Sequence, residues 1–212
     1  MLVLRELIFL FHFDEDLESL VLDSVLGLRS DTFLALEVPA AVKTQLVAAQ
    51  ENLRRELPRA RWTRSDGWHL TLKFLGEVEA PALEELATAL APRLRGHGGV
   101  SVRLGGTGFF PSPERPRVAW VGGAADGAES IVAEVEGAAE AAGFPRERRP
   151  WSIHLTQARL KDRWPSTAVD RFLEWGETLD LEAFECREVV LFESDLQPGG
   201  AVYTALERLS LE

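Results

Sequence analysis

The sequence contains two nearly identical strings, His69-Leu70-Thr71-Leu72 and His154-Leu155-Thr156-Gln157. They lie 85 residues apart, and each falls in a short apolar run that is typical of a β-strand, 68–75 and 152–158. One such string would carry little information on its own. Two of them in one chain, each in a predicted strand, indicate two related parts of the fold that contribute to a shared site.

Strand geometry decides which side chains of each string can act together. Successive side chains of a strand point to opposite faces, so His69 and Thr71 share one face while Leu70 points to the other. The same alternation places His154 and Thr156 together. Each string therefore presents an imidazole and a hydroxyl to one surface, and two facing strands would bring all four groups together.

The rest of the chain alternates between strand-like and helix-like segments. Strands are predicted at 32–38, 68–75, 100–104, 118–121, 152–158, 186–194 and 201–209, and helices at 40–57, 81–95, 128–142 and 167–175. The Gly- and Pro-rich segment 105–116 is predicted to be a loop, and 196–200 a hairpin turn. This order predicts an α+β fold with two pseudo-symmetric lobes, each an antiparallel sheet flanked by helices, and an active-site cleft between them.

The residue types in the two strings suit phosphoryl chemistry. A neutral imidazole can accept a proton from water and a protonated one can give a proton to a leaving oxygen, while threonine hydroxyls can donate to phosphate oxygens. Arg159 lies five residues after His154, nominally on the opposite face, but a twist or bulge at the strand end would bring its guanidinium to the same site. The competing interpretation is two buried histidines whose ring nitrogens bond to the backbone.

Composition limits the class of protein. The net charge of −11 argues against broad nucleic-acid binding, and a single cysteine, Cys186, excludes a disulfide framework and a cysteine-based zinc site. Basic residues nevertheless gather near both strings and the central segment, which predicts a basic cleft on an acidic body. They are Arg59, Arg61, Arg64, Lys73, Arg115, Arg117, Arg146, Arg148, Arg149, Arg159, Lys161 and Arg163.

Residues 1–30 look like an appendage to the folded unit. The apolar run 2–13 is too short to span a bilayer and lacks the layout of a signal peptide, so a cytoplasmic protein without a membrane anchor is expected. We expect 31–212 to form a single bilobal, monomeric domain. Residues 1–30 would be either a disordered N-terminal extension or the product of a misassigned start site, because Met1 is the only methionine.

The paired strings are the signature of the 2H phosphoesterase superfamily, and the chain resembles its RNA 2′,3′-cyclic phosphodiesterase (2′-5′ RNA ligase-like) family. The resemblance is carried by 61–77, 108–120 and 151–159, and it spans 31–209. It implies hydrolysis of RNA 2′,3′-cyclic phosphate ends to 2′-phosphomonoesters without a cofactor or metal. It also implies that His69 is the proton donor, that His154 is the proton acceptor, and that Thr71, Thr156 and Arg159 bind the phosphate.

Some points depart from this pattern or stay open. Residues 1–30 have no counterpart, and Gln157 stands where an apolar residue is common, although alternation points it away from the site. Alternative functions are 2′-5′ RNA ligation, hydrolysis of a small cyclic nucleotide, or non-catalytic binding of RNA ends. Phe109 and Phe110 can either stack on a base or pack within the predicted loop.

Overall fold

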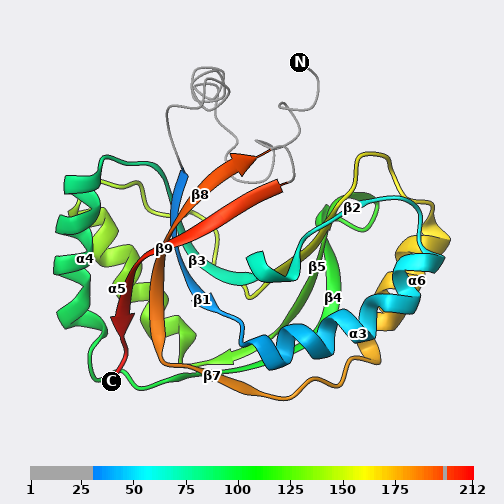
Figure 1. The fold of residues 1–212 in the computed structure, drawn as a ribbon, viewed down its shortest axis with the longest axis horizontal. Helices are drawn as coiled ribbons and strands as arrows, with labels where there is room; N and C mark the ends of the chain where they lie inside the picture. Colours follow the sequence, from blue (N-terminus) through cyan, green and yellow to red (C-terminus); the bar gives the residue numbers. More distant parts are fainter. Residues whose placement is uncertain (1–30, 198–199) are drawn as a thin grey trace.

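The computed structural model describes residues 31–197 and 200–212, so the predictions made for residues 1–30 lie outside the described part (Figure 1). The elements follow in the order β1 (Asp31–Glu37), α3 (Ala40–Glu56), β2 (Arg61–Trp62), the short 3₁₀ helix η1 (Ser65–Gly67), β3 (His69–Glu77), α4 (Ala80–Leu94), β4 (Val100–Ser112), β5 (Arg115–Asp126), α5 (Ala128–Ala141), β6 (Leu155–Arg159), α6 (Ser166–Glu177), β7 (Phe184–Cys186), β8 (Glu188–Gln197) and β9 (Gly200–Ser210).

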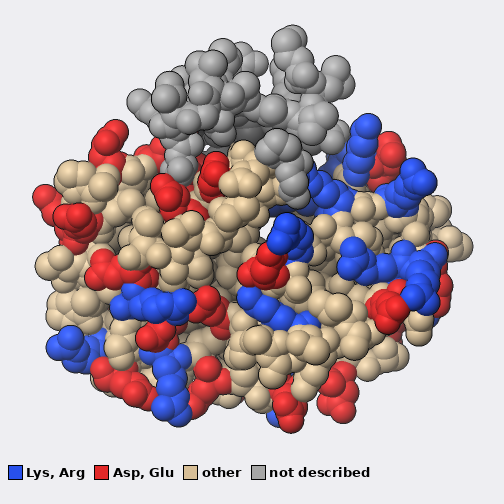
Figure 2. Space-filling model, in the orientation of Figure 1, with Lys and Arg blue, Asp and Glu red and all other residues tan. Residues whose placement is uncertain are grey.

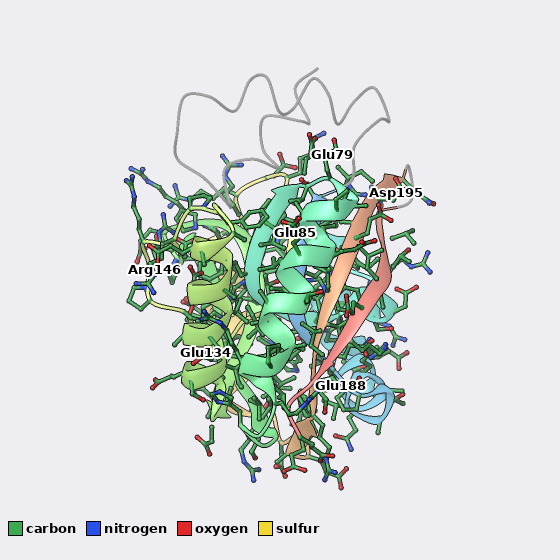
Figure 3. All side chains as sticks on the ribbon, turned by 90° about the vertical axis from the view of Figure 1, so that its left-hand side faces the viewer. Glu79, Glu85, Glu134, Arg146, Glu188 and Asp195 are labelled. Carbon is green, nitrogen blue, oxygen red and sulfur yellow. The ribbon has the colours of Figure 1, made fainter. Side chains whose placement is uncertain are left out.

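The strands form two separate antiparallel sheets. Sheet A has the order β3-β1-β8-β9, and sheet B has the order β2-β6-β5-β4-β7. Helices α4 and α5 pack on each other and contact β9 and β3 of sheet A, and Figure 3 shows them side by side in front of that sheet. Helix α6 contacts β4 of sheet B. The predicted α+β class with two antiparallel sheets flanked by helices is confirmed.

The lobes do not coincide with the two halves of the sequence. Lobe A consists of sheet A with α4 and α5, and lobe B of sheet B with α3 and α6 (Figure 1). Helix α3 follows β1 of sheet A but packs in lobe B, where its Ala49 carbonyl accepts a hydrogen bond from the Trp175 indole at 3.1 Å. The chain therefore crosses between lobes several times, which ties the two sheets to each other.

The prediction of a loop at 105–116 is wrong. β4 continues to residue 112 and β5 begins at 115, so the two strands form a long hairpin. The glycines serve the pairing rather than a loop, because the ladder has an irregularity between Leu104 and Thr107. Gly108 leaves room for the Trp120 ring, since a Cβ there would come 2.2 Å from Cζ2 of that indole.

The two strings lie where strands meet the core. β3 begins at His69, whereas β6 begins at Leu155, so the predicted strand 152–158 starts three residues later and His154 directly precedes it. Leu70 and Leu155 are fully buried in the hydrophobic core between sheets and helices. Burying each leucine stabilises the fold by about 1.5–3 kcal/mol, which fixes the opposite face of each strand toward the site.

None of the helices in the described part of the chain is long and apolar enough to cross a membrane.

Candidate active site

The two histidines have the same local geometry. Nδ1 of His69 donates to the carbonyl oxygen of Gly67 at 2.8 Å, and Nδ1 of His154 donates to that of Ser152 at 2.9 Å. In both cases the acceptor lies two residues before the histidine. Because a carbonyl can only accept, these bonds place a proton on Nδ1 and leave Nε2 available for proton transfer.

A β-bulge follows the threonine of the first string. In the ladder with β1, Thr71 pairs with Ala35 and Lys73 with Leu34, so Leu72 is an extra residue. The bulge puts Leu72 and Lys73 on the buried side together. The residue five places after the histidine, which simple alternation points into the core, therefore returns to the face of the site.

The second string carries the matching bulge. In the ladder with β5, Thr156 pairs with Trp120 and Ala158 with Ala119, so Gln157 is the extra residue. Gln157 is fully buried, hydrogen-bonds to Gln50 of α3 and donates to the Leu155 carbonyl at 3.0 Å. It points away from the site, as the sequence predicted.

The matched bulges explain how Arg159 reaches the site. Arg159 and Phe74 occupy equivalent positions, each five residues after its histidine, and both are partly exposed, whereas the residue before each of them is buried. The odd offset of Arg159 is thus corrected by the bulge that the sequence argument required. The symmetry ends there, because lobe A places a phenyl ring where lobe B places a guanidinium.

Hydrogen bonds connect each string to the segment that precedes the other string. The indole of Trp68 donates to Oγ1 of Thr63 at 2.8 Å, and that hydroxyl donates to the Thr156 carbonyl at 2.8 Å. In the opposite direction, the Trp151 indole donates to the Thr71 carbonyl at 2.8 Å. The structure therefore brings the strands of His69 and His154 together. Sequence reasoning missed this role of the tryptophans that precede the histidines.

Burial controls the electrostatics of the histidines. The pKa of His69 is lowered from 6.5 to about 4, mainly by burial and to a smaller extent by the charges of His154 and Lys43, while the bond to Gly67 acts in the opposite direction. Burial also lowers the pKa of His154. The effect of His154 on the pKa of His69 agrees with the hydrogen bonds that join the two strings. In the absence of a bound anion, both rings are therefore neutral at pH 7.

Tyr203 of β9 is a site residue that sequence reasoning missed. Its ring lies edge-on to His69 at 4.9 Å between centroids and packs on Gly67, the residue that holds His69. Burial raises the pKa of its phenol, and the positive charge of Arg159 partly offsets this. Tyr203 therefore lies between a histidine of lobe A and an arginine of lobe B. No local pattern marks it beyond its being the only tyrosine.

Further aromatic rings border each histidine. Phe33 lies 4.5 Å from His69 between ring centroids, and Phe110 lies edge-on to His154 at 5.1 Å and 5.4 Å from Trp120. Phe109 instead is buried in the core. Of the two phenylalanines considered for base stacking, only Phe110 is therefore beside the site.

The predicted basic cleft is smaller than the sequence suggested. Lys73 is buried by the bulge and pairs with Glu136 at 3.0 Å, while Arg64 and Arg146 are paired with carboxylates. Figure 2 shows Lys and Arg gathered on the upper part of lobe B, and Figure 3 places Glu85 and Glu134 on the helices of lobe A. The site thus lies beside the more basic lobe.

Arg159 remains as a cation in the site itself. Burial lowers its pKa, as does the neighbouring positive charge of Arg61, but a guanidinium stays protonated. In the described residues, no group of three or more His, Cys, Asp or Glu side chains is arranged to hold a metal ion. The two strings and Arg159 supply two imidazoles, two hydroxyls and a guanidinium, a set of groups suited to binding an oxyanion and moving protons beside it.

A family model and similar solved structures identify the class of protein. Residues 36–120 match the family model described as LigT like Phosphoesterase. The crystal structure of TT0787 of Thermus thermophilus superposes with a TM-score of 0.69 at 29% identity, covering 85% of this chain and 97% of that one. The crystal structure of E. coli LigT complexed with 3′-AMP gives 0.66 at 24% identity, covering 86% and 98%, and supports the fold alone.

Relatives narrow the class to one family. An RNA 2′,3′-cyclic phosphodiesterase of Thermus thermophilus is 37% identical over 189 residues, 84% of this chain and 89% of the relative. A protein of the same name from Thermotoga maritima is 30% identical over 187 residues, 85% of this chain and 95% of the relative. The chain belongs to the RNA 2′,3′-cyclic phosphodiesterase family of the 2H phosphoesterases.

Proposed function

We propose that this protein hydrolyses 2′,3′-cyclic phosphate ends of RNA to 2′-phosphomonoesters, with His69 and His154 as an acid–base pair. The observation that carries the proposal is the matched geometry of the two strings. Both imidazoles are anchored through Nδ1, and both threonines precede a bulge that completes the site face. Membership of the family supports the choice of substrate.

The proposed reaction is one in-line displacement at phosphorus. Nε2 of His154 accepts a proton from water as the water oxygen bonds to phosphorus, and the bond from phosphorus to the ribose 3′ oxygen breaks. Nε2 of His69 gives its proton to that departing oxygen. The products are a 2′-phosphomonoester and a free 3′ hydroxyl, so water is consumed and no other reactant is needed.

The remaining polar groups would hold the charge of the phosphate. The hydroxyls of Thr71 and Thr156 would donate to nonbridging oxygens from the two sheets, and Arg159 would add a charge-assisted bond. Bound phosphate would also favour the protonated form of His69. His69 must be protonated to act as an acid, and an anion beside it favours the imidazolium that burial disfavours.

The experiment that tests this function uses RNA with a 2′,3′-cyclic phosphate end and EDTA-treated enzyme. His69→Ala and His154→Ala should each lower kcat by at least about 100-fold, because each removes one proton-transfer step. His97→Ala is a matched control, since His97 is exposed on a different surface. Chromatography of the products against 2′- and 3′-phosphate standards should show the 2′-phosphate alone.

Three results would contradict the proposal: near-normal turnover by either histidine variant, a 3′-phosphate product, or no hydrolysis by the wild-type enzyme. Loss of activity in EDTA that a divalent metal restores would contradict the metal-free mechanism.

We further propose that the protein is a cytoplasmic monomer. Light scattering after gel filtration checks the mass against the 23.5 kDa of one chain.

A further inference from the structure

Arg61 lies directly beside the phosphate-binding arginine of the proposed site. It pairs with Arg159 across the antiparallel ladder of β2 and β6, where opposite residues project from the same face. The bulge at Gln157 turns Arg159 to the site face, and Arg61 therefore projects there as well. The electrostatic effect of Arg61 on Arg159 agrees with this placement.

Among the described residues, the two guanidiniums form a like-charge pair without a carboxylate partner. Like charges directly opposite each other in a sheet destabilise it. In residues 31–197 and 200–212, neither Arg61 nor Arg159 forms a salt bridge, although the chain has 34 acidic residues. By contrast, Arg64, three residues further on, is paired with Asp66 at 2.6 Å. An uncompensated pair of this kind is explained if anions occupy it during function.

The positions of the two arginines differ in one important respect. Arg159 is largely enclosed and lies near Tyr203, whereas Arg61 is exposed and lies toward the start of β9. A Cβ added at Gly200 would lie 3.7 Å from Nη2 of Arg61. Arg61 therefore lies between the two lobes at the protein surface, closer to solvent than Arg159.

We propose that Arg61 binds the phosphodiester on the 5′ side of the terminal nucleotide and thereby favours RNA chains over cyclic mononucleotides. This inference rests on the proposed function, since it takes Arg159 as a ligand of the reacting phosphate. A cyclic phosphate at the 3′ end is followed, toward the 5′ end, by the first internucleotide phosphate. Opposite residues of antiparallel strands lie about 4.5–5.5 Å apart, so two long arginines can reach successive phosphates.

The test compares three substrates: a 2′,3′-cyclic mononucleotide, a dinucleotide with the same cyclic end, and that dinucleotide with an uncharged methylphosphonate as its internal linkage. For the wild-type enzyme, kcat/KM should be about tenfold higher for the charged dinucleotide than for the methylphosphonate, the size expected of one charge-assisted bond. In Arg61→Gln the two dinucleotides should differ by less than about twofold.

Two further variants and one further measurement sharpen the result. Arg61→Lys should keep part of the preference, because it keeps the charge but loses the planar fork. Arg64→Gln is the matched control and should retain the full preference, since that arginine is already paired. The logarithm of KM for the charged dinucleotide should depend less steeply on the logarithm of salt concentration in Arg61→Gln, by about 0.7.

The outcomes separate this inference from the function on which it rests. If Arg61→Gln keeps the wild-type preference for the charged linkage, Arg61 does not contact that phosphate. If it lowers kcat/KM equally for all three substrates, Arg61 acts on the reacting phosphate instead, and the inference is wrong. Hydrolysis of the charged dinucleotide to its 2′-phosphate by the wild-type enzyme would uphold the proposed function in either case, whereas hydrolysis of none of the three would overturn both.

Discussion

At the scale of single residues, His69 lies where the requirements of folding and of the proposed catalysis differ most. The hydrogen bond of its Nδ1 orients Nε2. The neighbouring rings of Phe33 and Tyr203 exclude solvent that would stabilise a positively charged imidazole. Its pKa of about 4 means that the free enzyme holds this ring neutral at pH 7. As the proposed acid, His69 therefore needs the bound phosphate to raise its pKa before it can carry a proton at pH 7.

We expect binding of a nucleoside 2′-phosphate to raise the pKa of His69, because the phosphate anion stabilises the imidazolium. The side-chain signals of His69 in NMR spectra should titrate at about 4 in the free protein and at a higher pH in the complex. The nucleoside without its phosphate serves as the control and should leave the titration unchanged. In kinetics, the alkaline limb of kcat should lie at higher pH than that of kcat/KM. Identical titrations with and without the nucleotide would show that His69 does not face the phosphate.

Residue-level prediction succeeded where a short pattern defines the neighbours. Strand alternation alone places His69 with Thr71 and His154 with Thr156, and the structure brings both strings together. Tyr203 could not be found in this way, because its contacts with His69 are made across the interior of the molecule and follow from the pairing of β9 with β8. Likewise, the burial of Lys73 follows from a bulge that no residue type in the string announces.

At the scale of elements, the β4–β5 hairpin illustrates why composition misled the prediction. Glycine and proline between 105 and 116 suggest a loop, but the segment is paired in the hairpin, and Gly108 allows the close approach of an aromatic ring. Gly108 lies under Trp120, which in turn supports Phe110 beside His154. The extended hairpin is therefore part of the support of the site.

Gly108→Ala should destabilise the protein by about 1–3 kcal/mol, because the new methyl group overlaps the Trp120 ring and forces it to move. Gly105→Ala is the matched control in the same strand. No atom lies within 4 Å of a Cβ at that position, so the change should be neutral or stabilise by up to about 1 kcal/mol. Urea denaturation followed by tryptophan fluorescence measures both. Equal stability of the two alanine variants would mean that the Trp120 ring is not held on Gly108.

At the scale of the whole molecule, the site depends on how the two lobes are held relative to each other. The segment 142–154 leads from α5 in lobe A to β6 in lobe B and carries His154 at its end. A buried ion pair tethers it to lobe A. Nζ of Lys73 bonds to both carboxylate oxygens of Glu136 at 3.0 Å and to the Pro145 carbonyl at 2.9 Å, and Glu136 accepts from the Glu147 amide at 3.2 Å.

A second contact joins the same segment to lobe A: the Trp151 indole donates to the Thr71 carbonyl in the strand of the first string. A bulge that looks like a local irregularity of β3 thus has a consequence across the molecule, because it turns Lys73 inward to Glu136. We therefore expect contacts of this connecting segment, as well as the sheets, to set the separation of the two histidines.

Stability and catalysis should separate when the tether is replaced by apolar residues. Lys73→Met leaves the buried Glu136 carboxylate unpaired and should cost about 3–5 kcal/mol, while Lys73→Met combined with Glu136→Leu should recover most of that loss, since a buried ion pair can often be replaced by apolar side chains. The double variant no longer holds Pro145 and Glu147, so its kcat should remain at least about tenfold below wild type because His154 is less well positioned.

Arg146→Gln is the control on the same segment, because it removes an exposed pair with Glu140 at 3.5 Å that should contribute less than about 1 kcal/mol. Urea denaturation and steady-state kinetics on one preparation of each variant give both quantities. A double variant that regains stability and also turns over at the wild-type rate would show that the sheets alone position the histidines. A lower kcat at restored stability would instead show that the connecting segment helps to position His154, through its contacts with the lobe that carries His69.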